Sequence, residues 1–168
     1  MLTIIPATDD HLPVIRDMAY RTWPGTFGQI LTEEQIQYML EMMYSPMALR
    51  AQVHEQKHVF LLAQETGQDT FLGYVSYELT YRHQSVTKIH KLYIVPESQG
   101  KGVGNALVGA VADAARQVGD EALSLNVNRF NKAVGFYERL GFSVAGSETI
   151  DIGNGFMMDD LIMKKPLG

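Results

Sequence analysis

The chain has 168 residues, of which 46% are hydrophobic and 20% are charged, with a formal net charge of −5 at pH 7. This size suits one domain with a buried core, the hydrophobic fraction excludes general disorder, and the negative charge argues against nucleic acid as a partner. The absence of cysteine excludes disulfides, thiolate metal sites and a cysteine nucleophile.

The beginning of the chain has no recognisable targeting segment. Residues 1–20 lack the basic start and apolar block of a signal peptide, and no apolar run is long enough to span a bilayer. We therefore expect a cytoplasmic protein that does not associate with membranes.

The first third of the chain is predicted to form a short strand at residues 2–5 followed by helices. Pro24 and Gly25 should end the first helix near Arg21, because proline removes a hydrogen bond and clashes with the preceding turn. Residues 32–35, Thr-Glu-Glu-Gln, have the form of a capping box that opens a second helix through about residue 44. Residues 45–46, Ser-Pro, begin a third, short helical turn.

The rest of the chain alternates between strands and helices. A hairpin is predicted around residues 67–69, and apolar residues recur at helical spacing over 103–118. The expected elements are strands at 58–64, 70–81, 87–95, 122–127, 142–151 and 156–164 and helices at 103–118 and 131–140. No repeat, linker or low-complexity segment interrupts them, so we expect one domain over residues 1–168.

The most informative segment runs from Leu92 to Leu107. An apolar strand leads through a loop with Gly100, Gly102 and Gly104 into a helix. Glycines at alternate positions allow a ligand to approach the main chain, and a helix N-terminus offers unpaired N–H groups and a partial positive charge. The segment is therefore predicted to hold a pyrophosphate, and a tight turn without a ligand is the alternative.

The familiar nucleotide loops fit this segment poorly. A Walker loop needs Ser or Thr after Gly-Lys, and a dinucleotide fingerprint needs a third Gly or Ala where this chain has Asn105 or Leu107. The pattern Gln99-x-x-Gly102-x-Gly104 instead resembles the acetyl-coenzyme A signature of the GNAT superfamily of N-acetyltransferases.

A second motif strengthens this resemblance. Residues 126–142 are similar to the superfamily's downstream motif, in which an asparagine opens a helix ending Phe-Tyr-x-x-x-Gly-Phe. The order of predicted elements also matches the GNAT fold from end to end. The resemblance, closest to small bacterial members, implies an α/β fold with a central twisted mixed sheet and helices on both faces.

The resemblance also implies an activity. Acetyl would pass from acetyl-coenzyme A, without a metal, to a primary amine of a polyamine-like small molecule or of a peptide. The strand with Leu92 would splay from the strand ending at Val127, and its main chain would bind pantetheine and the acetyl oxygen. The residues implied to bind coenzyme A are Leu92, Tyr93, Ile94, Gln99, Gly100, Lys101, Gly102, Val103, Gly104, Asn105 and Asn131.

The same resemblance assigns the leaving thiolate's proton to Tyr137. A phenol stays protonated at neutral pH yet can protonate a sulfur anion, although an aromatic residue on a helix can also simply pack against a sheet. The family's pantetheine-binding asparagine lies three residues before the helix alanine, where this chain has Phe130. We therefore assign that contact to Asn131, with Asn128 as a substitute.

The general base is left open between two residues. An alkylamine is almost entirely protonated at pH 7, so a group must accept its proton. Many family members use a glutamate where this chain has Lys88. His90 on the same strand has an ordinary pKa suited to the task, and Glu78 on the preceding strand is the other candidate, whereas a packed, hydrogen-bonded histidine is the alternative for His90.

Acceptor recognition is expected near the first helices. Trp23 and Phe27 gather around the expected helix break, and aromatic residues beside acids such as Glu41 could receive a cationic amine. A buried helix stripe with a solvated acidic face is the alternative. The second function considered is a GNAT-shaped sensor or interaction module that binds coenzyme A without turnover, and homodimers are common in the family.

Overall fold

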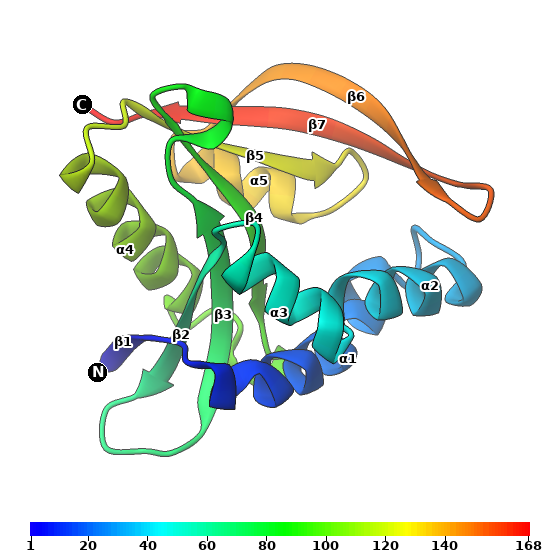
Figure 1. Cartoon of the computed structure of the whole chain (residues 1–168), viewed down its shortest axis with the longest axis horizontal. Coiled ribbons are helices and arrows are strands. Elements are labelled where there is room, and N and C mark those ends of the chain that lie inside the picture. Colours follow the sequence, from blue (N-terminus) through cyan, green and yellow to red (C-terminus); the bar gives the residue numbers. More distant parts are fainter.

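A computed structural model describes the whole chain, residues 1–168. It is a mixed α/β fold with one seven-stranded sheet, in the order β1-β2-β3-β4-β5-β7-β6 (Figure 1). The strands are β1 (Leu2–Pro6), β2 (Val59–Glu65), β3 (Phe71–Glu78), β4 (Val86–Ile94), β5 (Ala122–Asn128), β6 (Ser143–Gly153) and β7 (Phe156–Pro166). The helices are α1 (Leu12–Phe27), α2 (Glu33–Tyr44), α3 (Pro46–His54), α4 (Val103–Gln117) and α5 (Ala133–Arg139). The predicted fold class is confirmed.

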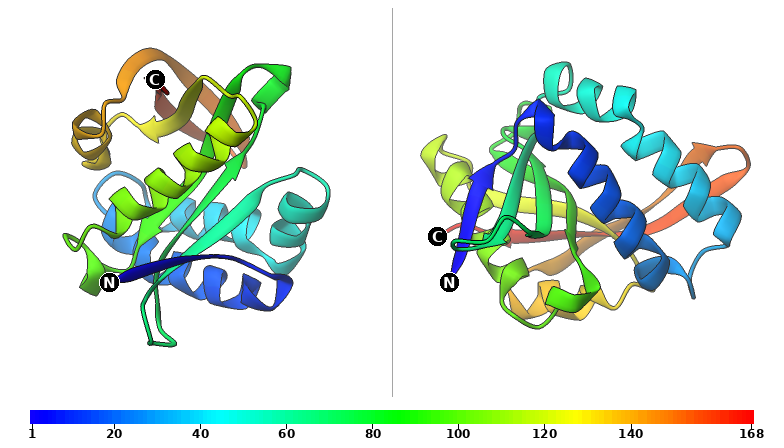
Figure 2. Two further views of the ribbon diagram at one scale, coloured as in Figure 1. Left: turned by 90° about the vertical axis from the view of Figure 1, so that its left-hand side faces the viewer. Right: turned by 90° about the horizontal axis from the view of Figure 1, so that it is seen from below.

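Helices cover both faces of the sheet (Figures 1 and 2). Helices α1, α2 and α3 pack on one face through a first core of 16 buried residues that includes Trp23 and Tyr74. Helices α4 and α5 pack on the other face through a second core of 16, including Val75 and Leu107. Successive side chains of a strand point to opposite faces, which is why neighbouring residues of β3 belong to different cores.

Strands β4 and β5 are paired over only part of their length. Their parallel ladder runs from Val86 opposite Ala122 to Ile89 opposite Leu125 and then stops, although β4 continues to Ile94. Beyond this point β4 pairs only with β3, and β5 only with β7. We call this gap in the pairing the β4–β5 opening. It is the splay that the resemblance implies, and it leaves main-chain groups of both strands available to a ligand.

A β-bulge lies where the opening begins. Ser76 pairs with Lys91 while Tyr77 pairs with Ile89, so His90 is an extra residue in β4. A bulge bends a strand and redirects its side chains. Here the bulge turns the His90 side chain toward Glu78 on β3.

Helix α1 does not end near Arg21 as predicted, because Pro24 lies inside it. Proline removes one hydrogen bond from the helix. Trp23 and Phe27 flank Pro24 and are both buried in the first core, and the N–H group of Gly28 bonds the Pro24 carbonyl at 2.9 Å. Tertiary packing therefore outweighs the local effect of proline.

Other boundaries also differ from the prediction, and strand β3 ends at Glu78 where residue 81 was expected. Helix α3 is a full helix of nine residues, whereas a short turn was expected. Helix α5 begins at Ala133, two residues later than predicted, because the Asn131 side chain accepts the Ala133 N–H at 2.8 Å and caps the turn before the helix. None of the helices has both the length and the apolar content needed to cross a bilayer.

Candidate active site

The loop before α4 presents a continuous row of free donors. None of the main-chain N–H groups from Gly100 to Asn105 donates a hydrogen bond within the chain. Gly100 and Gly102 have φ angles of +81° and +80°, and Gly102 is the N-cap of α4. Only glycine adopts such angles without strain, and the helix dipole adds partial positive charge at this end. The loop can therefore bind an anion such as a pyrophosphate.

Gly104 acts differently from the other two glycines. It is buried, and a Cβ atom placed on it would lie only 2.8 Å from Cζ of Phe136. Its lack of a side chain lets α5 pack against the beginning of α4, which is a structural role in addition to the predicted approach of a ligand. Its N–H group is still free to bind one.

The other residues predicted in this loop contribute in different ways. Val103 is buried in the second core, which leaves only its main chain for a ligand. The Gln99 side chain is exposed and lies 3.4 Å from the Ile94 carbonyl oxygen, to which its Nε2 atom donates. Lys101 and Asn105 are exposed, so their side chains can reach a bound phosphate from outside the loop.

Tyr137 is buried on α5, with 7% of its surface exposed. Its ring contacts Phe136 and Phe142 at centroid distances of 5.3 and 5.6 Å, while its hydroxyl bonds no other residue of the chain. Burial raises the pKa of Tyr137 above its ordinary value, so the phenol is protonated at neutral pH. The pKa of Tyr93 on β4 is also raised, mainly by burial, with smaller contributions from Tyr44, Tyr137 and Asp160.

Both candidate asparagines use one side-chain atom locally and keep another free. Oδ1 of Asn131 accepts from Ala133, and Oδ1 of Asn128 accepts from the Phe130 N–H at 3.0 Å. Their Nδ2 groups have no acceptor in the chain. Asn131 is partly exposed whereas Asn128 is buried, so Asn131 is the more accessible donor for pantetheine.

The structure brings the two candidate bases together. Nε2 of His90 lies 3.0 Å from Oε1 of Glu78, and His58, which precedes β2, lies 3.6 Å from the same oxygen. The two imidazole rings are stacked, with centroids 3.9 Å apart. A carboxylate can only accept, so Nε2 of His90 is the donor in the shorter contact.

The pKa of His90 is not the ordinary value on which its prediction as a base depends. Burial, His58 and the positive charges of Lys91 and Lys88 lower the pKa of His90 to about 2. Burial and the same lysines lower the pKa of His58 to about 4. Both rings are therefore neutral at physiological pH.

This cluster also has donor atoms spaced as a metal site would need. The ligand atoms of His58, Glu78 and His90 all lie within 4.8 Å of one another. However, the positive charges of Lys88 and Lys91 both lower the pKa values of these histidines. Lys91 is buried, and its Nζ atom lies 2.8 Å from Gln52 Oε1. This positive charge opposes a cation, so we interpret the cluster as a hydrogen-bonded one.

The predicted acceptor residues line the core beside β4. Trp23 and Phe27 are only 1% and 4% exposed, and their rings lie 5.7 and 6.5 Å from that of Tyr93. They therefore support Tyr93 from within the first core. Direct contact with an acceptor would need this core to open.

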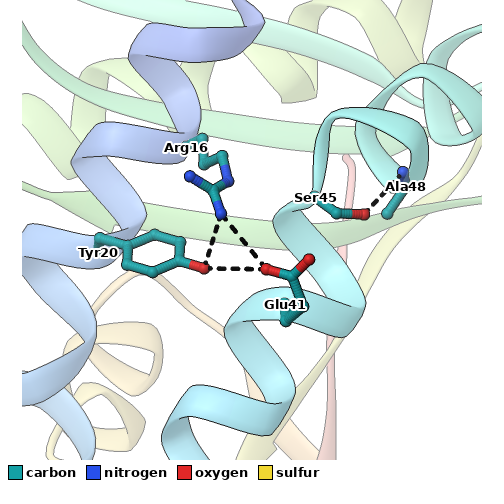
Figure 3. Close-up of polar contacts among 5 residues, drawn as sticks. All are labelled: Arg16, Tyr20, Glu41, Ser45 and Ala48. Carbon is teal, nitrogen blue, oxygen red and sulfur yellow. Dashed lines mark hydrogen bonds and ion pairs between the residues drawn. The ribbon is translucent and has the colours of Figure 1, made fainter.

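Glu41 is not a free acid, because it is paired within the chain. Its Oε2 atom lies 3.3 Å from Nη2 of Arg16 and 3.4 Å from the Tyr20 hydroxyl (Figure 3). This network joins α1 to α2, close to the Ser45 hydroxyl that caps α3 by accepting the Ala48 N–H at 3.1 Å. Glu41 therefore already has a cationic partner in Arg16, but its side chain is 66% exposed, and its contact with a cationic substrate stays a prediction.

One acidic group at the opening was missed by the sequence analysis. Asp160 on β7 is 7% exposed and bonds Asn126 on β5 at 3.3 Å. No motif marks it, because the contacts that define it join three strands. Only the alternating pattern of β7, with an acid where a core residue would otherwise lie, could have drawn attention to it.

The fold, the glycine loop and the β4–β5 opening are those of the GNAT class of domains. The chain belongs to the GNAT acetyltransferase domain family, whose model matches residues 29–158. It is 33% identical over 98 residues to the uncharacterized N-acetyltransferase YhfO of Bacillus subtilis, which is 56% of this chain and 64% of that protein. It is 36% identical over 99 residues, 58% of this chain, to the peptidyl-lysine N-acetyltransferase YjaB of Salmonella typhimurium, covering 60% of that protein.

Thus the matched segments span less than two thirds of either relative. Among solved structures, PaiA N-acetyltransferase from Thermoplasma acidophilum in complex with coenzyme A superposes with a TM-score of 0.81. The two sequences are 24% identical and the match covers 99% of each chain, which shows that the whole fold is shared.

Proposed function

We propose that this protein transfers acetyl from acetyl-coenzyme A to a primary amine of a small molecule or a peptide. The observation that carries the proposal is the row of six free main-chain N–H groups from Gly100 to Asn105 beside the β4–β5 opening. A pyrophosphate needs several preorganised donors, and an extended pantetheine arm needs strand-like partners. This chain offers both in adjacent places.

Pantetheine would lie in the opening as an added strand. Main-chain groups of Leu92, Tyr93 and Ile94 that face β5 would bind its amides, and Nδ2 of Asn131 would donate to one of its carbonyls. This arrangement brings the thioester to the beginning of the opening, next to the bulge at His90. The hydroxyl of Tyr137 reaches it from α5.

The reaction then follows as a direct attack. The neutral amine nitrogen forms a bond to the thioester carbonyl carbon, and the oxyanion accepts hydrogen bonds from main-chain N–H groups of β4. Collapse breaks the carbon–sulfur bond, Tyr137 donates its proton to the departing thiolate, and the nitrogen of the new amide returns its remaining extra proton to the Tyr137 oxygen, directly or through water. Burial raises the pKa of Tyr137 and so weakens it as an acid. Burial also raises the pKa of a thiol bound beside it, which favours transfer of the proton to the thiolate.

Glu78 is the better of the two bases. Its carboxylate accepts the hydrogen bond from Nε2–H of His90, whereas the lowered pKa of His90 means that this ring binds protons weakly. We assign the proton of the attacking ammonium to Glu78, directly or through water, and assign His90 the role of holding the carboxylate by its Nε2–H donor. The His58 ring stacks on His90 and keeps it in place.

The relative that acts on peptidyl-lysine supports an alkylamine acceptor. Trp23 and Phe27 would shape the acceptor site by fixing Tyr93. A homodimer and a cytoplasmic location remain predictions, which light scattering on the purified protein and cell fractionation would test.

The decisive experiment measures thiol release from acetyl-coenzyme A with a panel of polyamines, amino acids, aminoglycosides and peptides. Release with any amine supports the proposal. Calorimetric binding of acetyl-coenzyme A without release on any amine supports a sensor instead. No binding at all would overturn both.

A further inference from the structure

A second group of acidic side chains lies on the far side of the β4–β5 opening from Glu78. Glu148 on β6 and Asp160 on β7 are directly opposite in the antiparallel ladder. Between them, Nδ2 of Asn126 donates to Glu148 at 2.8 Å and to Asp160 at 3.3 Å. Two carboxylates are therefore held side by side around one amide.

No ion pair within the chain neutralises these two carboxylates, and the positive charge of Lys88 acts on Asp160 without a direct contact. Neither Glu148 nor Asp160 forms an ion pair with a lysine or arginine, whereas the adjacent Asp159 is paired with Arg129 at 2.9 Å. Like charges opposite each other in a ladder are unfavourable. The two carboxylates thus have no directly paired cation within the chain, and a cationic ligand can supply one.

Asp160 also has an unused acceptor. The residue is only 7% exposed, and its buried Oδ1 atom has no hydrogen-bond partner. Burial raises the pKa of the Asp160 carboxyl, and Glu148 adds to that effect, while Asn126 and Lys88 oppose it. A buried, unpaired carboxylate oxygen is unfavourable in a folded protein and usually has a functional reason.

The position of this pair relates it to the proposed reaction. Met158 belongs to the first core, so the alternation along β7 puts Asp160 on the same face of the sheet. Tyr74 of β3 also belongs to the first core, and Glu78, four residues further along the same strand, therefore lies on that face too. Asp160 also contributes to the raised pKa of Tyr93, which lies on β4 at the opening. Carboxylates therefore flank the opening on one face, Glu78 on one side and Asp160 with Glu148 on the other.

We propose that Asp160, Glu148 and Asn126 form a subsite for a second cationic group of the acceptor. The amine that reacts would lose its proton near Glu78, while an ammonium elsewhere in the same molecule stays charged and binds Asp160 and Glu148. Neighbouring strands are about 4.8 Å apart, so the subsite lies roughly one to two strand spacings from the opening. The preferred acceptor is then a diamine or polyamine with a short alkyl spacer. This inference rests on the proposed acetyltransferase function.

The test compares two acceptors with the same four-carbon chain, 1,4-diaminobutane and butylamine, which differ by one ammonium group. Assays contain EDTA so that no divalent cation can occupy the carboxylates. We expect the unmodified protein to have a kcat/KM at least about tenfold higher for the diamine. Asp160→Asn and Glu148→Gln should each remove most of this preference and change the butylamine value little.

Controls separate this subsite from general effects. Asp151→Asn removes the same charge from an exposed residue of β6 and should leave the preference intact. The melting temperature of Asp160→Asn should equal or exceed that of the unmodified protein, because a buried like-charge contact is relieved. Glu148 is exposed, so Glu148→Gln carries the test if Asp160→Asn fails to fold.

Several results would overturn the inference. These are equal kcat/KM values for both amines in the unmodified protein, an undiminished preference in both variants, or equal losses on both amines with a lowered melting temperature. Turnover of some amine in the wider panel together with any of these results would leave the proposed function standing. If no amine is turned over, calorimetric titration of 1,4-diaminobutane into the coenzyme A complex tests the subsite instead. Binding that is abolished in Asp160→Asn supports the subsite, and the absence of binding to the unmodified protein excludes it.

Discussion

His90 donates a hydrogen bond of 3.0 Å to the carboxylate of Glu78, and this contact exists because a bulge in β4 turns the His90 side chain toward β3. The bulge begins at the residue after the last pair between β4 and β5. One irregularity in the sheet therefore coincides with the start of the β4–β5 opening and places a carboxylate next to it.

Replacing Glu78 should affect chemistry more than binding. Glu78→Gln is expected to lower kcat by about 10²–10⁴-fold, because a positioned base is lost, with little change in coenzyme A affinity. Steady-state kinetics and calorimetry measure the two effects. Glu55→Gln, which removes the same charge from an exposed residue at the end of α3, should behave like the unmodified protein.

The pH dependence of the rate separates His90 from Glu78. The lowered pKa of His90, about 2, keeps its ring neutral through the whole assay range. His90→Ala should therefore slow the reaction yet retain the acidic limb of the pH–rate profile. Disappearance of that limb in His90→Ala would identify His90 as the titrating base.

Tyr137→Phe tests the source of the thiolate's proton. The ring still fills its place between Phe136 and Phe142, so folding and coenzyme A binding should persist while kcat falls about 10²–10⁴-fold. Tyr38→Phe is the matched control, since it removes a hydroxyl that bonds the Ile152 carbonyl at 2.7 Å. Unchanged turnover in Tyr137→Phe would rule out its role as the acid.

Two glycines near α4 provide a matched pair. Gly102→Ala forces a φ of +80° on alanine, at a cost of about 1–2 kcal/mol, and should weaken coenzyme A binding. Gly109→Ala lies on α4 with open space around its Cβ position and should stabilise the helix by up to about 1 kcal/mol. Chemical denaturation and calorimetry measure both. A Gly102→Ala protein with normal affinity would show that the loop conformation does not matter.

The two stacked histidines should make the fold sensitive to acid. Their folded pKa values, about 4 for His58 and about 2 for His90, lie below the unfolded value near 6.5, so the unfolded chain binds more protons below pH 6.5. Their contribution to stability is complete above pH 6.5 and is lost as pH falls toward 4, by at most about 1.4 kcal/mol per pH unit for each ring.

Glu78, Lys88 and Lys91 face these rings and shape that response. A double variant, His58→Gln with His90→Gln, should lose less unfolding free energy between pH 7 and 5 than the unmodified protein. Urea denaturation at several pH values measures the difference. Parallel curves for the two proteins would contradict the prediction.

The sequence by itself determined the order of strands and helices and the positions of the glycine loop and the α2 cap. These features depend on residues close together in the chain. Thr32 does accept the Gln35 N–H at 3.1 Å, as the capping pattern predicts, and Gly100 and Gly102 do adopt conformations that glycine favours. The opening between β4 and β5 was predicted from the resemblance to the GNAT superfamily, because periodicity cannot reveal it.

Only the tertiary structure decided how distant residues act on one another. Helix α1 continues beyond Pro24 because Trp23 and Phe27 pack in the first core. Gly104 is required at its position because Phe136 packs against it. The depressed pKa of His90 and the shared contacts of Asp160 arise between strands that are far apart in the chain. Burial and pairing register set these properties, and both are created when the sheet assembles, so no local pattern of residues encodes them.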